Sequence, residues 1–208
     1  KIMERLQYEN PWWTSNEIST TYALMPRRLY FDQFYPYVAD RDIRRAVVLM
    51  GPRRVGKTVM MYHTIARLIS EGVPAQKIGF IGVDNPIYIN LGLQDILDIY
   101  LQAIGNTSLK DTYIFFDEIQ YLKDWERHLK VLVDSYPDTK FIVSGSAAAA
   151  LKWQRKWRRQ VHRLYVATTY FSGIYSPKRQ KSPYAKAKYH LCWQGNTLLG
   201  KYLPQGTK

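Results

Sequence analysis

The sequence predicts a three-layer α/β fold, with helices on both faces of a parallel sheet. Short apolar runs alternate along the chain with amphipathic helical stretches, which is the order expected when parallel strands are joined by crossover helices. The runs are apolar throughout rather than at every second position, as in strands that are buried on both faces. With 208 residues, of which 46% are hydrophobic, the chain is long enough to bury a substantial core.

The core of this fold is predicted between residues 43 and 151. Strands are expected at 46–50, 78–83, 113–116 and 140–143, and helices at 57–70, at 94–104 and after Asp124. Glycine, proline and serine residues follow these segments and mark their ends. Asp124 is placed to cap the last of the helices.

Residues 1–42 are predicted to form a helical leader that packs on the core. The segment is rich in aromatic residues, including Trp12, Trp13, Phe31 and Phe34. Large aromatic side chains are more often buried than exposed, so packing is favoured over the alternative, which is a contact surface for a partner.

The chain carries a net charge of +13, and all of the excess lies at its C-terminal end. The 17 acidic residues all precede Lys152, where they balance 17 of the 30 Lys and Arg residues, and the other 13 basic residues lie in 152–208. This split argues against a uniformly basic nucleic-acid-binding domain. Residues 152–208 show no sustained period and are predicted to form an irregular, poorly ordered basic tail.

The remaining composition favours a cytoplasmic protein with no membrane-spanning segment. No apolar run approaches the roughly 20 residues that a transmembrane helix requires. The first residues contain no apolar signal segment. Cys192 is the only cysteine, which excludes an intrachain disulfide and a Cys-rich zinc site.

Residues 51–58, Gly-Pro-Arg-Arg-Val-Gly-Lys-Thr, match the phosphate-binding pattern G-x-x-x-x-G-K-[ST]. They lie between a predicted buried strand and an amphipathic helix, the context that such a P-loop requires, and the alternative is a plain Gly-rich turn. Backbone N–H groups of a P-loop surround phosphate oxygens, and the helix N-terminus that follows adds a positive dipole end. Lys57 is expected to neutralise the β- and γ-phosphates of ATP, and Thr58 to offer its hydroxyl to Mg²⁺. The two loop arginines are expected to face phosphate, a neighbouring subunit or solvent. The predicted nucleotide-binding residues are Gly51, Pro52, Arg53, Arg54, Val55, Gly56, Lys57, Thr58 and Val59.

Asp117 and Glu118 follow the apolar strand at 113–116, which would deliver them to the C-terminal edge of the sheet. Ligands of α/β folds bind at this edge. Asp117 is predicted to hold Mg²⁺ through its hydration shell, and Glu118 to orient and polarise the attacking water. The alternative is a helix N-terminus that carries two acids.

Two serines, Ser144 and Ser146, end the fourth predicted strand. If this strand lies between the first and the third, either hydroxyl could reach the γ-phosphate or the attacking water, and a simple turn is the alternative. With Lys57 and Glu118 they form the predicted catalytic set. Asp84, at the end of the second strand, is a weaker candidate for the same cleft.

These motifs resemble a prokaryotic family of AAA-type ATPases, whose members pair an AAA domain with a C-terminal domain of unknown function. The matching stretches are Arg27-Arg28-Leu29-Tyr30, Gly51 to Thr58, Phe116 to Gln120, Trp125-Glu126 and Phe141 to Ala148, within roughly residues 20–151. The resemblance implies ATP binding, hydrolysis, and a sheet in which the Ser144 strand lies between the strands before Lys57 and Asp117. The resemblance is compatible with a homo-oligomer and does not identify a client.

After Leu151 the sequence departs from this family, and the regular final strand is predicted to be missing. Members continue with Gly-Arg-Phe-Thr-Asp-Phe, then Leu-Pro-Pro-Leu-Thr-Phe and a Glu-Tyr pair. Residues 160–171, reread with one nucleotide dropped from permitted codons and completed by the first nucleotide of the Ser172 codon, can encode Arg-Phe-Thr-Asp-Phe-Met-Leu-Pro-Pro-Leu-Thr-Phe. We therefore hypothesise that the chain from about Leu151 or Lys152 onward is translated out of frame, and the sequence of the encoding gene tests this. Loss of the strand would leave the strand at 46–50 with an open edge.

Three functions remain at this stage. The favoured one is an ATP-binding, Mg²⁺-dependent ATPase coupled to an unknown client. A nucleic-acid-associated ATPase is the second, since the basic tail mixes Lys and Arg with Trp and Tyr, which suit phosphate contacts and base stacking. The third is an ATP-binding switch with little turnover, because an arginine that reaches a neighbouring subunit's γ-phosphate often lies beyond Leu151 in such ATPases.

Overall fold

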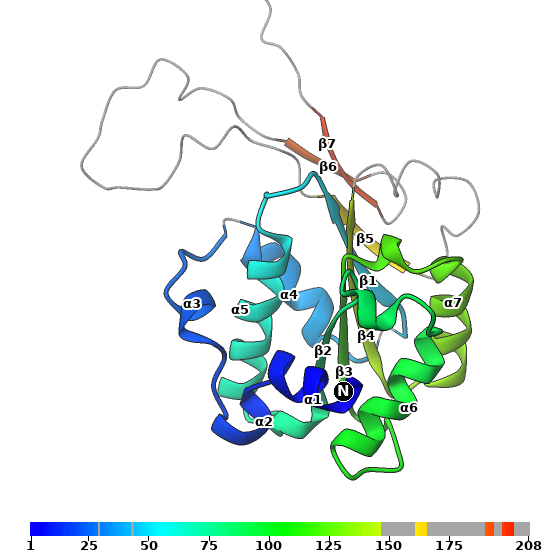
Figure 1. Cartoon of the computed structure of the whole chain (residues 1–208). Helices are drawn as coiled ribbons and strands as arrows, with labels where there is room; N and C mark the ends of the chain where they lie inside the picture. Colours follow the sequence, from blue (N-terminus) through cyan, green and yellow to red (C-terminus); the bar gives the residue numbers. More distant parts are fainter. Residues whose placement is uncertain (29, 43, 147–160, 166–189, 194–196, 202–208) are drawn as a thin grey trace, which may run out of the picture.

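The computed structural model describes residues 1–28, 30–42 and 44–146, and the backbone of three further segments, 161–165, 190–193 and 197–201 (Figure 1). The α-helices are α1 (Ile2–Glu9), α2 (Trp12–Ser15), α3 (Thr20–Ala23), α4 (Phe31–Ala39), α5 (Lys57–Ser70), α6 (Leu93–Ala103) and α7 (Trp125–Ser135). The strands are β1 (Ala46–Gly51), β2 (Ile78–Gly82), β3 (Tyr113–Asp117), β4 (Lys140–Ser146), β5 (Val161–Tyr165), β6 (His190–Trp193) and β7 (Thr197–Lys201). Three 3₁₀-helices are η1 (Ala75–Lys77), η2 (Pro86–Tyr88) and η3 (Ile119–Tyr121). Across the described part of the chain, no helix is long and apolar enough to cross a membrane.

The four core strands and three core helices lie where the sequence predicts them, and the strands form a parallel sheet. The strand order is β2-β3-β4-β1-β5-β7-β6. Strand β4 therefore lies between β1 and β3, as the family resemblance implies. In this register Leu49 is opposite Ser144 and Gly51 is opposite Ser146. The carboxyl ends of β1, β3 and β4 consequently meet at one edge of the sheet.

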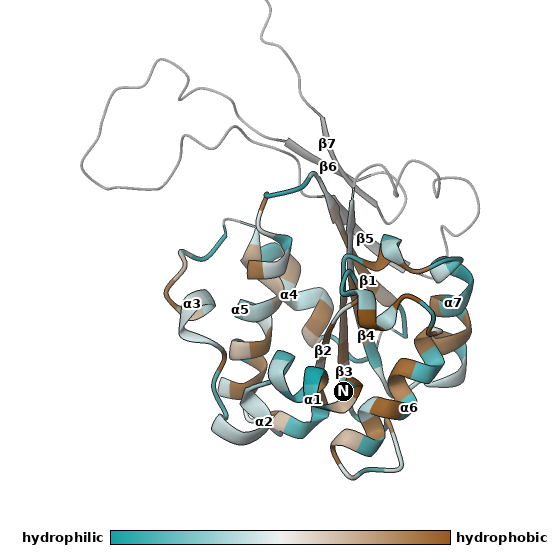
Figure 2. Cartoon of the chain, viewed as in Figure 1, coloured by the Kyte–Doolittle hydropathy of each residue, from teal (hydrophilic) through white to brown (hydrophobic). Residues whose placement is uncertain are grey.

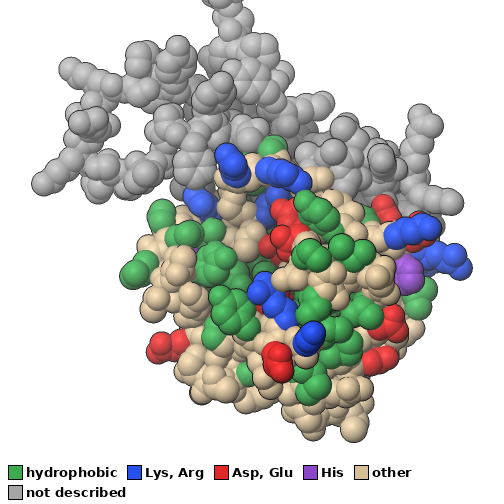
Figure 3. Space-filling model, in the orientation of Figure 1, with side chains coloured by type: hydrophobic (Ala, Val, Ile, Leu, Met, Phe, Trp, Pro, Cys, Tyr) green, Lys and Arg blue, Asp and Glu red, His purple; other side chains and the backbone are tan. Residues whose placement is uncertain are grey.

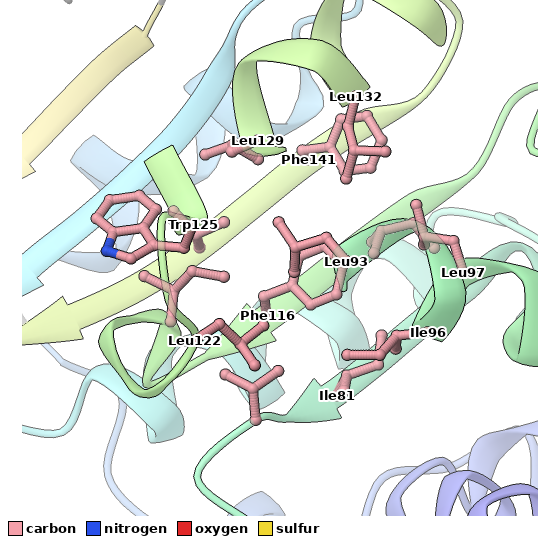
Figure 4. Close-up of a cluster of buried hydrophobic side chains, with 14 of the residues drawn as sticks. Ile81, Leu93, Ile96, Leu97, Phe116, Leu122, Trp125, Leu129, Leu132 and Phe141 are labelled. Carbon is pink, nitrogen blue, oxygen red and sulfur yellow. The ribbon is translucent and has the colours of Figure 1, made fainter. Parts of the chain in front are cut away.

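Two hydrophobic clusters, one on each face of the sheet, give the three-layer architecture. On one face α4 and α5 pack on alternate strand residues such as Leu49, Phe115 and Ile142. On the other face α6 and α7 cover the intervening residues, among them Phe116 and Phe141 (Figure 4). Strands β1 to β4 are accordingly apolar along most of their length, whereas the helices carry both apolar and polar residues (Figure 2). A fully buried Leu or Phe side chain contributes about 1.5–3 kcal/mol, so these clusters supply the main driving force for folding.

Residues of the leader pack on the core and cover the edge of the sheet at β2. The buried Asn10 side chain donates to the carbonyl of Phe80 at 2.8 Å and accepts from the Phe80 N–H at 2.6 Å. The indoles of Trp12 and Trp13 both donate to the carbonyl of Ile78 at 2.9 Å. Side chains thus take the place of a neighbouring strand on backbone groups that an exposed edge would leave unpaired.

The far side of β1 differs from the expectation of an open edge. Strand β5, from the segment predicted to be an irregular tail, pairs with β1 in parallel, with Ala46 opposite Val161 and Met50 opposite Tyr165. Strand β7 in turn pairs with β5, and β6 with β7. Strand pairing uses backbone N–H groups, which every residue except proline supplies, and backbone C=O groups, which every residue supplies, so a segment without an apolar period in its sequence can still pair there.

The cap at the start of α7 also differs from the prediction. Asp124 occupies the N-cap position, but its side chain makes no capping hydrogen bond. Its backbone is left-handed, with φ of 51°, whereas a capping side chain normally belongs to an extended residue. Helix α7 is held instead by its buried face, which includes Trp125, Leu129 and Leu132.

Candidate nucleotide-binding site

The loop between β1 and α5 has the backbone shape that a phosphate-binding loop needs. Strand β1 is buried along its whole length and ends at Gly51. Arg54 and Gly56 then adopt left-handed conformations, with φ of 66° and 88°, and α5 begins at Lys57. The first N–H groups of a helix have no partner within it, so α5 presents donors and a positive dipole end at this loop.

Lys57 is buried at the mouth of the loop, with 4% of its surface exposed. Its ammonium donates to the carbonyls of Gly51 at 3.2 Å and Pro52 at 3.0 Å. It also lies 3.8 Å from a carboxylate oxygen of Glu118. The charge is therefore held inside the site rather than in solvent, and a phosphate group can compete for the same three donor hydrogens.

Asp117 is the centre of a hydrogen-bond network that joins three elements. The hydroxyl of Thr58, in the first turn of α5, donates to Asp117 Oδ2 at 2.7 Å. The hydroxyl of Ser144, on β4, donates to the other carboxylate oxygen, and it accepts from the backbone N–H of Glu118 at 3.0 Å. Burial raises the pKa of the Asp117 carboxyl, and the charges of Glu118 and Asp84 raise it further, against the hydrogen bonds from the two hydroxyls.

These residues fit a bound Mg²⁺ ion. A buried carboxylate whose pKa is raised by burial and by neighbouring acids gains from a nearby cation. The hydroxyl of Thr58 and the carboxylate of Asp117 are hard oxygen donors that already adjoin one another. Mg²⁺ commonly takes one or two protein oxygens and completes its shell with water and phosphate oxygens.

Glu118 lies half-buried at the end of β3 in a left-handed conformation, with φ of 54°. This conformation is unfavourable for a residue with a Cβ atom, and residues that adopt it are enriched at active sites and ligand-binding sites. One carboxylate oxygen faces Lys57, and the other accepts a hydrogen bond from the side-chain amide of Gln120. The carboxylate is therefore held from both sides.

The other predicted site residues are less closely joined to this network. Arg53 and Arg54 are exposed, and Arg53 donates to the hydroxyl of Tyr121 at 2.9 Å. Val59 is buried. The backbone N–H of Ser146 donates to Gln120 Oε1 at 2.9 Å, so this serine reaches the network through its backbone.

The remaining predictions occupy the margin of the site. Pro52 and Val55 are half-buried residues of the loop. Asp84 is exposed and acts on Asp117 through its charge.

Two residues adjoin the site that the motif reasoning did not single out. The first is Arg28, whose guanidinium lies against the loop: a Cβ atom added to Gly56 would lie 2.3 Å from Arg28 Nε. The second is Gln120. Both belong to stretches that carry the family resemblance, which was the one signal in the sequence that could have pointed to them.

The fold and the network together define the class of the protein, a nucleotide-binding P-loop domain of the AAA type. The chain belongs to the AAA domain family, whose model matches residues 43–172. The match starts at the predicted beginning of the core and continues past Leu151. The out-of-frame hypothesis for the following residues stays a prediction that the encoding gene tests.

Two curated relatives are similar to this chain, and both are uncharacterized proteins. One, from Methanocaldococcus jannaschii, is 28% identical over 149 residues, which cover 68% of this chain and 30% of the relative. The other, from Haemophilus influenzae, is 26% identical over 131 residues, which cover 62% of this chain and 31% of the relative. The chain thus spans about 30% of the length of these relatives.

A solved structure of the S. cerevisiae Hsp104–ADP complex is similar in fold. The likeness covers 80% of this chain and 24% of that chain, with a TM-score of 0.51 and 18% sequence identity. At this identity the comparison concerns the fold of the domain.

Proposed function

We propose that this chain is an ATP-hydrolysing domain of the AAA type that works with Mg²⁺ and is coupled to an unknown client. The observation that carries the proposal is the network in which Lys57, Thr58, Asp117, Glu118 and Ser144, from three separate strand ends, lie within contact of one another. Burying the charges of Lys57 and Asp117 at the carboxyl ends of the strands costs free energy, and charged ligands that complete the site would offset this cost. A triphosphate with a divalent cation supplies both the negative and the positive charge that these residues match.

Each side chain has a role that follows from its chemistry. Lys57 binds the β- and γ-phosphates and neutralises charge that develops during transfer, and the loop N–H groups hold the remaining phosphate oxygens. Glu118 accepts a proton from the attacking water, because its carboxylate lies half-buried at the sheet end beside Lys57, where the γ-phosphate would be bound. Ser144 fixes Asp117 and the Glu118 backbone, and Ser146 lies at the edge where the γ-phosphate would face β4.

Thr58 and Asp117 would hold Mg²⁺, which when bound supplies charge neutralisation on the phosphate oxygens. The two residues contribute an oriented pair of oxygens, since each is already fixed by the other. We expect that the domain extends over residues 43–151 with the leader as an integral part, and that it works in the cytoplasm and as an oligomer of the kind that AAA proteins often form.

The face of the molecule shown in Figure 3 does not favour nucleic acid as the substrate. On the face shown in Figure 3, acidic and basic side chains are interspersed and no broad basic patch is present among the described residues. Nucleic-acid binding by a domain rests on a continuous basic surface. The basic residues of the predicted tail lie outside the described side chains and add nothing to this comparison.

The test is nucleotide binding and turnover in two variants. Lys57→Ala removes contacts to two phosphates that are worth about 1.5–3 kcal/mol each, so the Kd for Mg-ATP should rise by roughly a hundredfold or more. Glu118→Gln should keep the Kd within about threefold and lower kcat by about 10²–10⁴, the usual contribution of a general base. The exposed Lys123 offers a matched control, and Lys123→Ala should leave both constants unchanged. Unaltered ATP affinity in Lys57→Ala would refute the site.

A further inference from the structure

Gln120 joins the carboxyl ends of two strands through a single side chain. It lies on η3, two residues after Glu118. Its amide nitrogen donates to Glu118 Oε2, and its amide oxygen accepts from the backbone N–H of Ser146 at 2.9 Å. One end of the amide therefore touches the carboxylate at the end of β3, and the other touches the backbone at the end of β4.

The amide lies directly against β4. A Cβ atom added to Gly145 would lie 3.1 Å from Gln120 Oε1 and 2.8 Å from the sulfur of Met50. Gly145 is thus the residue that lets the amide approach so closely. The contact also requires both a donor and an acceptor in one planar group, which Gln has and which neither Glu nor Met provides.

The position of the Glu118 carboxylate depends on this contact. The Glu118 backbone is already fixed by its N–H bond to Ser144, but the side chain beyond it could rotate. Two groups restrain it, the Gln120 amide on one oxygen and the Lys57 ammonium, at 3.8 Å, near the other. If a bound phosphate draws the Lys57 ammonium away from Glu118, the Gln120 amide is the restraint on the Glu118 carboxylate that remains among the residues that the structure describes.

We propose that Gln120 is a positioning residue that sets the carboxylate of Glu118 for water activation and ties its orientation to the end of β4. The inference rests on the proposed ATPase function. Alignment of a catalytic group accounts for a large part of enzymatic rate, and small displacements reduce turnover without changing substrate affinity. The residue acts through Glu118 and does not itself contact the phosphates.

The first experiment is steady-state ATP hydrolysis by Gln120→Met, which keeps the length of the side chain and removes both hydrogen bonds. We expect kcat to fall about tenfold to a hundredfold, with the Kd for Mg-ATP within about threefold of wild type. Gln102, exposed on α6, gives the matched control, and Gln102→Met should behave as wild type. The isosteric Gln120→Glu guards against a folding defect, because it fills the same space, loses the donor and should also lose turnover.

A double-mutant cycle separates positioning from a general structural role. In a Glu118→Ala background, measured by single-turnover hydrolysis, Gln120→Met should cause no further loss, because the group that it positions is gone. An equal further loss in that background would overturn the proposal, and so would unchanged kcat in both Gln120 variants. A wild-type chain that binds ATP but never hydrolyses it would instead refute the proposed ATPase function itself.

Discussion

The contact between the leader and the sheet edge gives a prediction whose size follows from the structure. Asn10 is 1% exposed and forms three hydrogen bonds, two of them with Phe80 across the edge of β2. Substitution by alanine removes both bonds to Phe80 and leaves its N–H and C=O groups without the partner that the amide supplies. The carbonyl of Leu6 loses one donor but keeps the backbone N–H of Asn10 at 3.1 Å.

The expected cost is two unsatisfied backbone groups. Each costs about 1–3 kcal/mol when buried, and access of water to an edge strand reduces this, so we expect a loss of about 2–4 kcal/mol in the free energy of unfolding. In a domain of this size about 1 kcal/mol shifts Tm by roughly 2–4 °C, which gives a fall of roughly 4–16 °C. Asn10→Asp has the same shape and keeps the acceptor but places a carboxylate against the Phe80 carbonyl, so it should be at least as destabilising.

Urea unfolding followed by circular dichroism measures both variants. Asn90, which is exposed, provides the control, and Asn90→Ala should lie within about 0.5 kcal/mol of wild type. If Asn10→Ala were as stable as Asn90→Ala, the hydrogen bonds between the Asn10 amide and the β2 backbone would not stabilise the fold. The leader would then not be an energetically coupled part of the sheet.

Two further predictions concern other parts of the core. Burial lowers the pKa of Lys140 to about 8, against 10.5 in the unfolded chain. Between these two pH values the unfolded state binds more protons than the folded state, so the free energy of unfolding should rise with pH in that window. Urea titrations between pH 7 and 10.5 should show this rise in the wild type and not in Lys140→Met, and parallel pH profiles for the two proteins would contradict the assignment. Gly56 and Gly72 both have positive φ, but only at Gly56 would a Cβ meet another side chain, Arg28. Gly56→Ala should therefore lower Tm more than Gly72→Ala, which carries only about 1–2 kcal/mol of backbone strain. In an Arg28→Ala background the difference in Tm between the two variants should become smaller. Equal shifts in Tm for Gly56→Ala and Gly72→Ala would rule out the clash.

The sequence was a good guide wherever the relevant interactions are local. Helix α5 begins at Lys57 and ends at Ser70, as its apolar spacing predicts, and the strands before Gly51 and Asp117 lie where their apolar runs place them. A strand that is buried on both faces has a continuous apolar run, and a helix that is buried on one face has apolar residues at a period near 3.6. Both kinds of element can therefore be predicted from the sequence.

The structure differs from the sequence-based predictions where backbone geometry or the pairing of distant segments decides the outcome. Asp124 has the residue type of a helix cap, but its left-handed backbone directs the side chain elsewhere. Strand β5 pairs with β1 although its segment shows no sustained apolar period, because pairing relies on backbone groups. The residue type alone predicts neither the φ angle of a turn residue nor which strand will pair with a given strand.

By itself the sequence determined the layered α/β fold, the glycine-rich loop that matches a phosphate-binding pattern, and the acidic pair at Asp117. These follow from periodicity and from short motifs whose residues act together within a few positions. Only the tertiary structure decided that Asn10 closes the β2 edge from 70 residues away and that Gln120 links Glu118 to the end of β4. A hydrogen bond between distant segments depends on which strand ends the fold brings together, and that choice is made by the packing of the whole core rather than by any one segment.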